Sequence, residues 1–204
     1  MTHTTHRLSS PGRDYIIHLR TLQGKTDLGS GKAHRLILEK ILPLHPVNIG
    51  SQTTGDINNV SMEQILAGIR DGENFHIVFD DKEPFLAALE TLRELDTGLS
   101  VIISAPQQTV QEVQRRFHLD MPAVVLDIGI LNPPQLPAWE QKILSQCGHM
   151  RLSLPLARQL LADIRNGTLS PDDAAHILGR PCSCGCYNAK EVSRIFQSAI
   201  KDPS

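Results

Sequence analysis

Between residues 61 and 130, short apolar runs alternate with longer stretches of helical periodicity, and this alternation is the strongest constraint on the fold. Three runs have the length and composition of buried strands: 75–79, 100–104 and 123–129. Between them, residues 84–95 and 109–118 place their apolar side chains at helical spacing. Strand–helix–strand segments of this length are typical of right-handed crossovers on a sheet buried on both faces. The sequence therefore predicts an α/β fold, with a three-layer, mostly parallel sheet covered by helices.

Local signals support these elements and add others. Ser61 and Gln64 form the pattern of a capping box, which predicts a helix start. Thr109 and Glu112 repeat this pattern, so a second helix should begin there. Residues 15–19 predict a further strand near the N-terminus. Aromatic residues make up only 4% of the chain, so the core must be built mainly from aliphatic side chains, which suits helices packed on a sheet.

The chain divides into four predicted parts. Residues 1–13 are polar and contain proline and glycine, so we expect a disordered arm. Residues 14–131 form the α/β domain, and a Pro-rich stretch at 132–137 predicts a stiff linker. Residues 138–204 predict helices separated by short turns, and all four cysteines of the chain lie in this part. We therefore expect the last part to be a small helical metal-binding segment.

Net charge and apolar content exclude several classes of function. The formal net charge is −2; residues up to 137 carry 12 basic against 16 acidic side chains, and later residues carry 8 against 6. Neither part has the concentrated positive charge that binds phosphate backbones, so we expect no nucleic-acid partner. No apolar stretch approaches the roughly 18 residues of a membrane span, and the first residues lack the apolar core of a signal peptide. We therefore expect a cytoplasmic protein with no membrane contact, in which clustered cysteines serve as ligands or redox groups rather than disulfides.

The densest chemical signal is a group of three cysteines within five positions: Cys182, Cys184 and Cys186. A predicted helix follows the group, and the free N–H groups at its start favour thiolates in the loop. A second pair of ligand side chains, Cys147 and His149, lies upstream. Four cysteines, or three cysteines with a histidine, suit tetrahedral zinc, and four cysteines also suit an iron–sulfur cluster. A thiol redox switch and a purely structural role of the cysteines are the alternatives.

Two short motifs in this part resemble a pattern found in proteins of anaerobic prokaryotes that carry no named activity. The motifs are Cys147-Gly-His149 and Pro181-Cys-Ser-Cys-Gly185. The resemblance is strongest over residues 147–188, and an anaerobic setting implies iron–sulfur rather than zinc. It implies a common metal-binding set: Cys147, His149, Cys182 and Cys184. Cys186 departs from the pattern, which has an aliphatic residue there, so the fourth ligand stays open between Cys186 and His149.

Weaker signals in the α/β part indicate an anionic ligand. A glycine-rich loop at 24–32 offers amides and lysines after a strand, although it departs from the phosphate-loop pattern. A polar segment at 48–59 has a length often seen in functional loops, and Asp80 ends a strand, where open α/β sheets bind ligands. The candidate ligand residues are Gly29, Gly31, Lys32, Ser51, Thr53, Thr54, Asp56 and Asp80. The alternatives are a surface loop, an ordinary connection and a helix cap, and isolated histidines such as His18 and His76 are expected to be structural.

Two functions are consistent with these patterns. The first is a metal- or iron–sulfur-binding protein of the cytoplasm with an accessory or redox role. The second is an α/β enzyme or sensor that binds a nucleotide or an anionic metabolite, with a structural zinc site in its C-terminal part. The residues favour zinc and an iron–sulfur cluster equally. A homodimer or another protein partner would fit a cysteine site shared between chains, but a site within one chain is favoured.

Overall fold

The computed structural model of the chain describes residues 13–119 and 135–201. Three predicted features therefore lie wholly or partly outside the described residues: the arm at 1–13, the strand at 123–129 and the linker at 132–137. Within the described ranges, no helix is long and apolar enough to cross a lipid bilayer.

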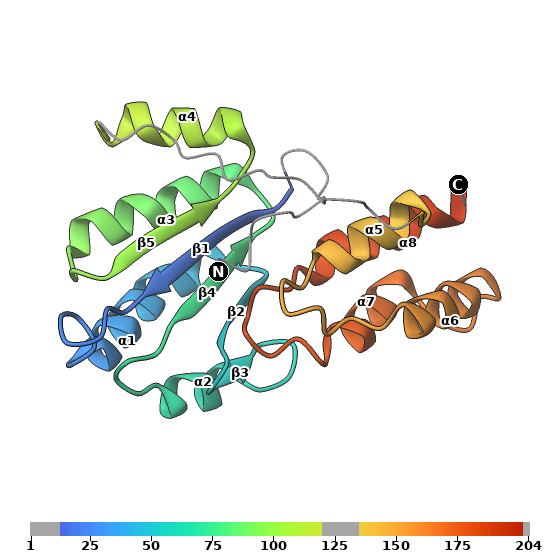
Figure 1. The fold of residues 1–204 in the computed structure, drawn as a ribbon, viewed down its shortest axis with the longest axis horizontal. Coiled ribbons are helices and arrows are strands. Elements are labelled where there is room, and N and C mark those ends of the chain that lie inside the picture. The colour runs from blue at the N-terminus through green and yellow to red at the C-terminus, as the bar shows by residue number, and fades with distance from the viewer. Residues whose placement is uncertain (1–12, 120–134, 202–204) are drawn as a thin grey trace.

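Five strands and eight α-helices make up the described part of the fold (Figure 1). The strands are β1 (Tyr15–Arg20), β2 (Asn48–Ser51), β3 (Gly55–Asp56), β4 (Phe75–Phe79) and β5 (Ser100–Ser104). The first four α-helices are α1 (Ser30–Ile41), α2 (Met62–Gly68), α3 (Lys82–Leu95) and α4 (Gln107–Arg116). The C-terminal α-helices are α5 (Ala138–Ser145), α6 (Leu154–Arg165), α7 (Pro171–Gly179) and α8 (Ala189–Lys201). A short 3₁₀-helix, η1 (Leu42–Leu44), follows α1.

The five strands form one sheet in the order β3-β2-β4-β1-β5 (Figure 1). Every neighbouring pair in it is antiparallel: β2 pairs with β3 and β4, and β1 pairs with β4 and β5. The α/β class is confirmed, but the prediction of a mostly parallel sheet is wrong.

The error lies in the strand neighbours and not in the crossover. Since β4 and β5 are both antiparallel to β1, they run in the same direction as each other, and α3 connects them. β1 occupies the position between them, so β4 and β5 do not pair with each other. Both β1 and β4 are nearly continuous buried runs, and hydrophobic periodicity does not encode which strand lies beside which.

One face of the sheet is packed with aliphatic and aromatic side chains. Ile17 of β1 and Ile77 of β4 are partners in the strand register, and both are fully buried. α1 and α3 cover this face, with Leu38 and Phe85 in the same core cluster. α2 and α4 contribute further buried side chains. Removal of this apolar surface from water is the main stabilising contribution on this side.

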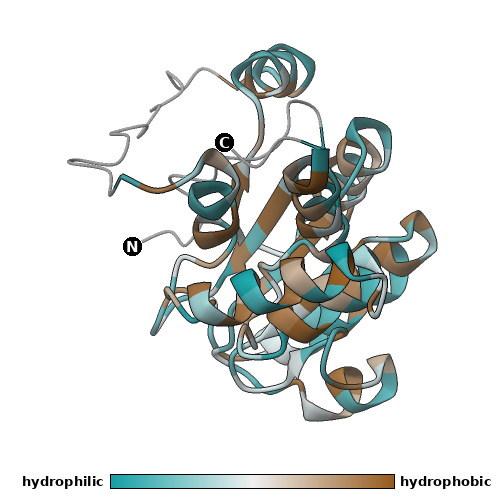
Figure 2. Cartoon of the chain, turned by 90° about the vertical axis from the view of Figure 1, so that its right-hand side faces the viewer, coloured by the Kyte–Doolittle hydropathy of each residue, from teal (hydrophilic) through white to brown (hydrophobic). Residues whose placement is uncertain are grey.

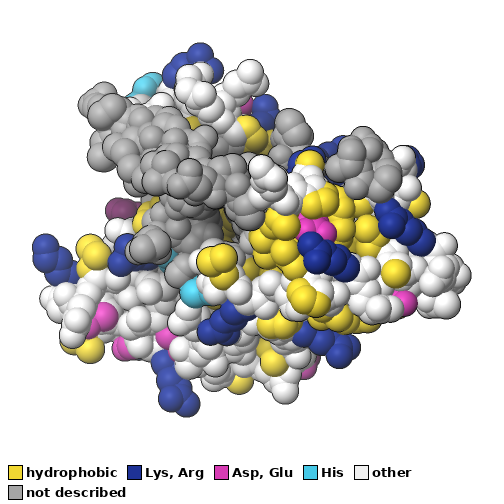
Figure 3. Space-filling view, turned by 45° about the vertical axis from the view of Figure 1, so that its right-hand side comes forward, with side chains coloured by type: hydrophobic (Ala, Val, Ile, Leu, Met, Phe, Trp, Pro, Cys, Tyr) yellow, Lys and Arg dark blue, Asp and Glu magenta, His cyan; other side chains and the backbone are white. Residues whose placement is uncertain are grey.

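The four C-terminal helices, α5 to α8, cover the opposite face. Ile16 and Val78, each next in sequence to a residue of the first face, belong to one core cluster with Trp139, Leu178 and Phe196. Figure 2 looks onto these helices and shows apolar and polar residues in each of them, as expected for amphipathic helices. Figure 3 shows that hydrophobic side chains also gather on the surface on the side of these helices.

One of the two capping boxes in the first part of the chain is confirmed. The Ser61 side chain accepts a hydrogen bond from the backbone of Gln64, and the Gln64 side chain accepts one from the backbone of Ser61. The box predicted at Thr109 is wrong, because α4 already begins at Gln107. Pro106 occupies the N-cap position, so Thr109 is the third residue of the helix and lies within its first turn.

Candidate metal centre

The cysteine loop between α7 and α8 lies against the sheet because two glycines meet there. Gly185 has a φ of +83°, in the left-handed region, and a Cβ at this position would lie 2.3 Å from the backbone nitrogen of Gly50 in β2. Only glycine permits so close an approach with this backbone. The contact brings the side chains on either side of Gly185, those of Cys184 and Cys186, onto the sheet.

Buried polar groups hold the loop in this position. The side-chain amide of Asn48 in β2 donates to the carbonyl oxygen of Tyr187 at 2.9 Å and to Oδ2 of Asp56 at 3.0 Å. The Tyr187 hydroxyl donates to the carbonyl oxygen of Ala175 in α7 at 2.6 Å. Asp56 is fully buried, and this burial raises the pKa of its carboxyl group, although hydrogen bonds from Asn48 and Asn59 oppose the shift. These bonds tie the loop to β2 and to α7.

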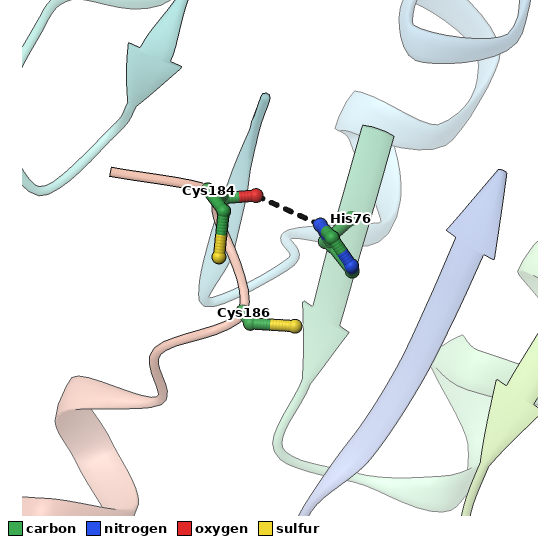
Figure 4. Close-up of side chains that lie close together, drawn as sticks. All are labelled: His76, Cys184 and Cys186. Carbon is green, nitrogen blue, oxygen red and sulfur yellow. Dashed lines mark hydrogen bonds between the residues drawn. The ribbon is translucent and has the colours of Figure 1, made fainter. Parts of the chain in front are cut away.

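Three soft ligand side chains meet, within the part of the chain that the structure describes, where the loop crosses the sheet: His76, Cys184 and Cys186. One ligand atom from each lies within 4.8 Å of the other two, and all three side chains are buried. Figure 4 shows His76 on β4 and the two cysteines on the loop, with the Cys186 sulfur directed toward the strand. Thiolate sulfur and imidazole nitrogen are favoured ligands of zinc and other soft metals. This group can therefore hold a metal ion.

The His76 ring is held in a tautomer that suits metal binding. Its Nδ1 lies 2.9 Å from the carbonyl oxygen of Cys184 (Figure 4), and since a carbonyl only accepts, Nδ1 carries the hydrogen. In the neutral ring, Nε2 then has the lone pair that a metal requires. The ring also stacks on His18 of β1, with 4.1 Å between the centroids. A bond from the second ring nitrogen to a carbonyl is a common support of metal-bound histidines.

The other two cysteines extend the group. The Sγ of Cys182 lies 4.0 Å from the Sγ of Cys184, and the Cys147 side chain forms a hydrogen bond with that of Cys182. The hydrogen bond with Cys182 lowers the pKa of Cys147 to about 6 and also lowers the pKa of Cys184. Cys182 keeps its own proton, because the hydrogen bonds with Cys147 and Cys184, together with burial, raise its pKa. A bound cation would replace the proton that these neighbouring sulfurs share.

His149 lies outside the group of His76, Cys184 and Cys186. Its Nε2 is 2.8 Å from the side-chain nitrogen of Gln52, which follows β2, and its side chain is half-buried. The sequence motifs do not indicate His76, which lies 108 positions from Cys184. The signal that points to it is a single polar residue inside the otherwise apolar run of β4.

The glycine-rich loop before α1 has its amides engaged by the protein itself. The N–H groups of Gly29 and Gly31 each donate to the carboxylate of Asp71 at 2.8 Å. These bonds lower the pKa of Asp71. Lys32 follows on α1 and is exposed. A phosphate would therefore have to displace an internal carboxylate to use these amides.

The remaining ligand candidates lie in two different places. Ser51 and Thr53 line a polar cavity of about 480 Å³ at one end of the sheet, and the Thr54 hydroxyl lies 3.0 Å from that of Ser51. Asp80, directly after β4, forms an ion pair with Arg194 of α8. Its carboxylate therefore links the sheet to the C-terminal helices.

Comparison of the chain with protein-family models finds no match, and comparisons with curated proteins and with solved structures find none either. The functional assignment therefore rests on the chemistry of the side chains. The central observation is the group of His76, Cys184 and Cys186, which can hold a metal ion.

Proposed function

We propose that this chain is a metal-binding protein whose buried centre holds one tetrahedrally coordinated ion, with zinc as the preferred metal. The ligands are His76, Cys182, Cys184 and Cys186. The observation that carries the proposal is the approach of His76 to Cys184 and Cys186 within 4.8 Å. His76 lies 108 positions from Cys184, so two distant segments supply soft ligands at one point. Cysteines that only fill the core would not need a histidine from a distant segment beside them.

The spacing of two sulfurs supports a single ion. Two ligands at about 2.3 Å from one tetrahedral zinc lie about 3.8 Å apart. The sulfurs of Cys182 and Cys184 are 4.0 Å apart, close to this value. In a four-iron cluster each cysteine binds a different iron, which places the sulfurs farther apart. A four-iron cluster would therefore require the loop to open.

The burial of the centre supports an accessory role in which the metal stabilises the fold. The four cysteines and His76 are each at most 3% exposed. A closed site with four protein ligands is the arrangement of structural zinc, whereas catalytic zinc keeps an open position. The ion would join the loop of the C-terminal helices to β4. Cys147 stays outside the ligand set and forms a hydrogen bond with Cys182.

Metal analysis of protein purified without oxygen and without added metal tests the proposal. We expect one zinc per chain and no absorption of visible light. The substitutions His76→Gln and Cys184→Ser should each abolish metal binding. The matched control is His18→Gln, because His18 stacks on His76 but lies outside the ligand group, and this variant should retain the ion.

Two other results would change the conclusion. Iron with acid-labile sulfide and a brown colour would replace zinc by an iron–sulfur cluster on the same cysteines. A protein that contains neither metal and takes up no added zinc would refute the metal centre.

A further inference from the structure

The polar cavity of about 480 Å³ lies beside the metal centre. β1 and β2 end at this cavity and β4 begins there, so Arg20, Ser51 and His76 all lie in its wall. Its volume is in the range of small-molecule sites, about 300–1,000 Å³. Since His76 belongs both to the wall and to the ligand group, a molecule in the cavity would lie next to the ion.

Two arginines without an ion-pair partner in the described part of the chain line the cavity, together with two acids, Asp71 and Glu73. Arg20 and Arg70 line it and are exposed, and neither forms an ion pair with any described residue. The acid beside them, Asp71, is already engaged by the backbone N–H groups of Gly29 and Gly31. A guanidinium group binds carboxylates through paired N–H bonds. The two arginines therefore favour an anionic ligand.

A buried acid in the same wall adds a second requirement. Glu73 is 9% exposed, and its Oε2 accepts a hydrogen bond from the Ser51 hydroxyl at 3.0 Å. Its Oε1 has no hydrogen-bond partner among the described residues. A buried oxygen without a partner is unfavourable, and a donor group on a ligand would relieve this.

We infer that the cavity binds a small carboxylate that also carries a hydroxyl or amino group. Arg20 and Arg70 hold the carboxylate, and Glu73 accepts a hydrogen bond from the second group. None of these three residues belongs to the metal ligands, so the binding site does not rest on the proposed metal centre. His76 only places the bound molecule beside the ion.

Calorimetric titration of the purified protein with L-malate, succinate and inorganic phosphate tests the site. We expect malate to bind with a Kd below about 1 mM, and succinate, which lacks the hydroxyl group, to bind about tenfold more weakly. Arg20→Gln and Arg70→Gln should each weaken malate binding by about tenfold. Glu73→Ala, which removes the acceptor, should make malate and succinate bind with similar affinity.

Arg115→Gln is the matched control, because Arg115 is an exposed arginine of α4 that does not line the cavity. This variant should bind malate as the wild type does. The inference is wrong if no probe binds at about 10 mM, or if the Arg20 and Arg70 variants bind malate as tightly as the wild type. Tightest binding of phosphate would overturn the carboxylate class. In Cys184→Ser protein, loss of metal with malate binding retained would separate this site from the metal centre.

Discussion

The two faces of the sheet use alternate residues of the same strands, yet they are stabilised in different ways. On the face under α1 and α3, Ile17, Ile77 and Phe79 pack in a cluster of apolar side chains. On the face under α5 to α8, Ile16 and Val78 share one cluster with all four cysteines. The first face depends on apolar area removed from water. A core of this kind tolerates apolar substitutions that conserve side-chain volume. The second combines apolar packing, in which Trp139, Leu178 and Phe196 take part, with polar contacts of His76 and the cysteines.

The second face shows how a group of possible metal ligands is fitted into a protein core. The alternation of β4 that directs Ile77 to the apolar face places His76 on the opposite face, where the Cys184 carbonyl binds its Nδ1. Gly50 and Gly185 let the cysteine loop approach the sheet backbone closely. Under the proposed function, the C-terminal helices would depend partly on an ion and its supports, whereas α1 and α3 depend on packing.

Removal of the proposed ion should produce the largest difference in stability between the two faces. Chelation should lower the free energy of unfolding by about 4 kcal/mol for a metal previously present at a thousandfold excess over its Kd. Because the proposed ion would tie the loop to β4, amide hydrogen exchange should rise first in α7 and α8, while α1 and α3 stay protected. Equal loss of protection on both faces would show that the ion is not a specific support of the C-terminal helices.

A pair of glycine substitutions isolates the close approach of the loop to the sheet. Gly185 and Gly98 both have positive φ, but a Cβ at Gly98 would meet no atom within 4 Å, whereas one at Gly185 would meet the Gly50 backbone. We expect Gly98→Ala to cost about 1 kcal/mol of stability and Gly185→Ala about 3–4 kcal/mol, with loss of metal. Urea unfolding and metal analysis measure both effects. Similar values for the two variants would mean that the loop does not need this contact.

The apolar face has an ionisable exception whose effect should appear as pH dependence. His34 of α1 is fully buried against Phe75, and burial lowers its pKa from 6.5 to about 4. In the unfolded chain His34 takes up a proton near pH 6.5, whereas in the folded chain it stays neutral down to about pH 4. The contribution of His34 to stability is therefore complete above that pH and falls by about 3 kcal/mol as the pH drops toward 4.

The measurement is urea unfolding of metal-free protein at about pH 7 and about pH 4.5, with His34→Leu as the comparison. The variant should lack this part of the decrease in stability. An identical decrease in stability in both proteins would show that His34 is protonated in the folded state. Water would then reach this side chain in the apolar face.

The smallest expected effect concerns the ion pair between the end of β4 and α8. The side chains of Asp80 and Arg194 are 10% and 31% exposed, whereas those of Asp81 and Arg13, which form a neighbouring pair, are 63% and 52% exposed. Asp80→Asn should lower the free energy of unfolding by about 1–2 kcal/mol, and Asp81→Asn by at most about 0.5 kcal/mol. Chemical denaturation of both variants compares them. A larger loss of stability for Asp81→Asn than for Asp80→Asn would show that the Asp80–Arg194 pair does not attach the C-terminal helices to the sheet.

Local patterns along the chain were enough to predict most of the individual helices and strands. The apolar runs at 75–79 and 100–104 are β4 and β5, and the capping pattern at Ser61 starts α2 as predicted. These features depend on neighbours within a few residues, so spacing and capping chemistry are enough to locate them. The spacing of the loop cysteines likewise indicated a ligand-rich segment. A ligand role for Cys147 and His149, which lie outside the proposed ligand set, is an untested prediction.

The neighbours of each strand, and the side chains that face the cysteines, follow from the packing of the whole chain. β1 lies between β4 and β5, and His76 meets a loop 108 positions away. Hydrophobic periodicity records which face a residue occupies within its own strand or helix, but not the partner opposite it. That partner depends on closing long loops and packing the whole chain, and no local pattern contains this information. The antiparallel sheet, the approach of His76 to Cys184 and Cys186, and the cavity lined by Arg20 and Arg70 all arise at this level.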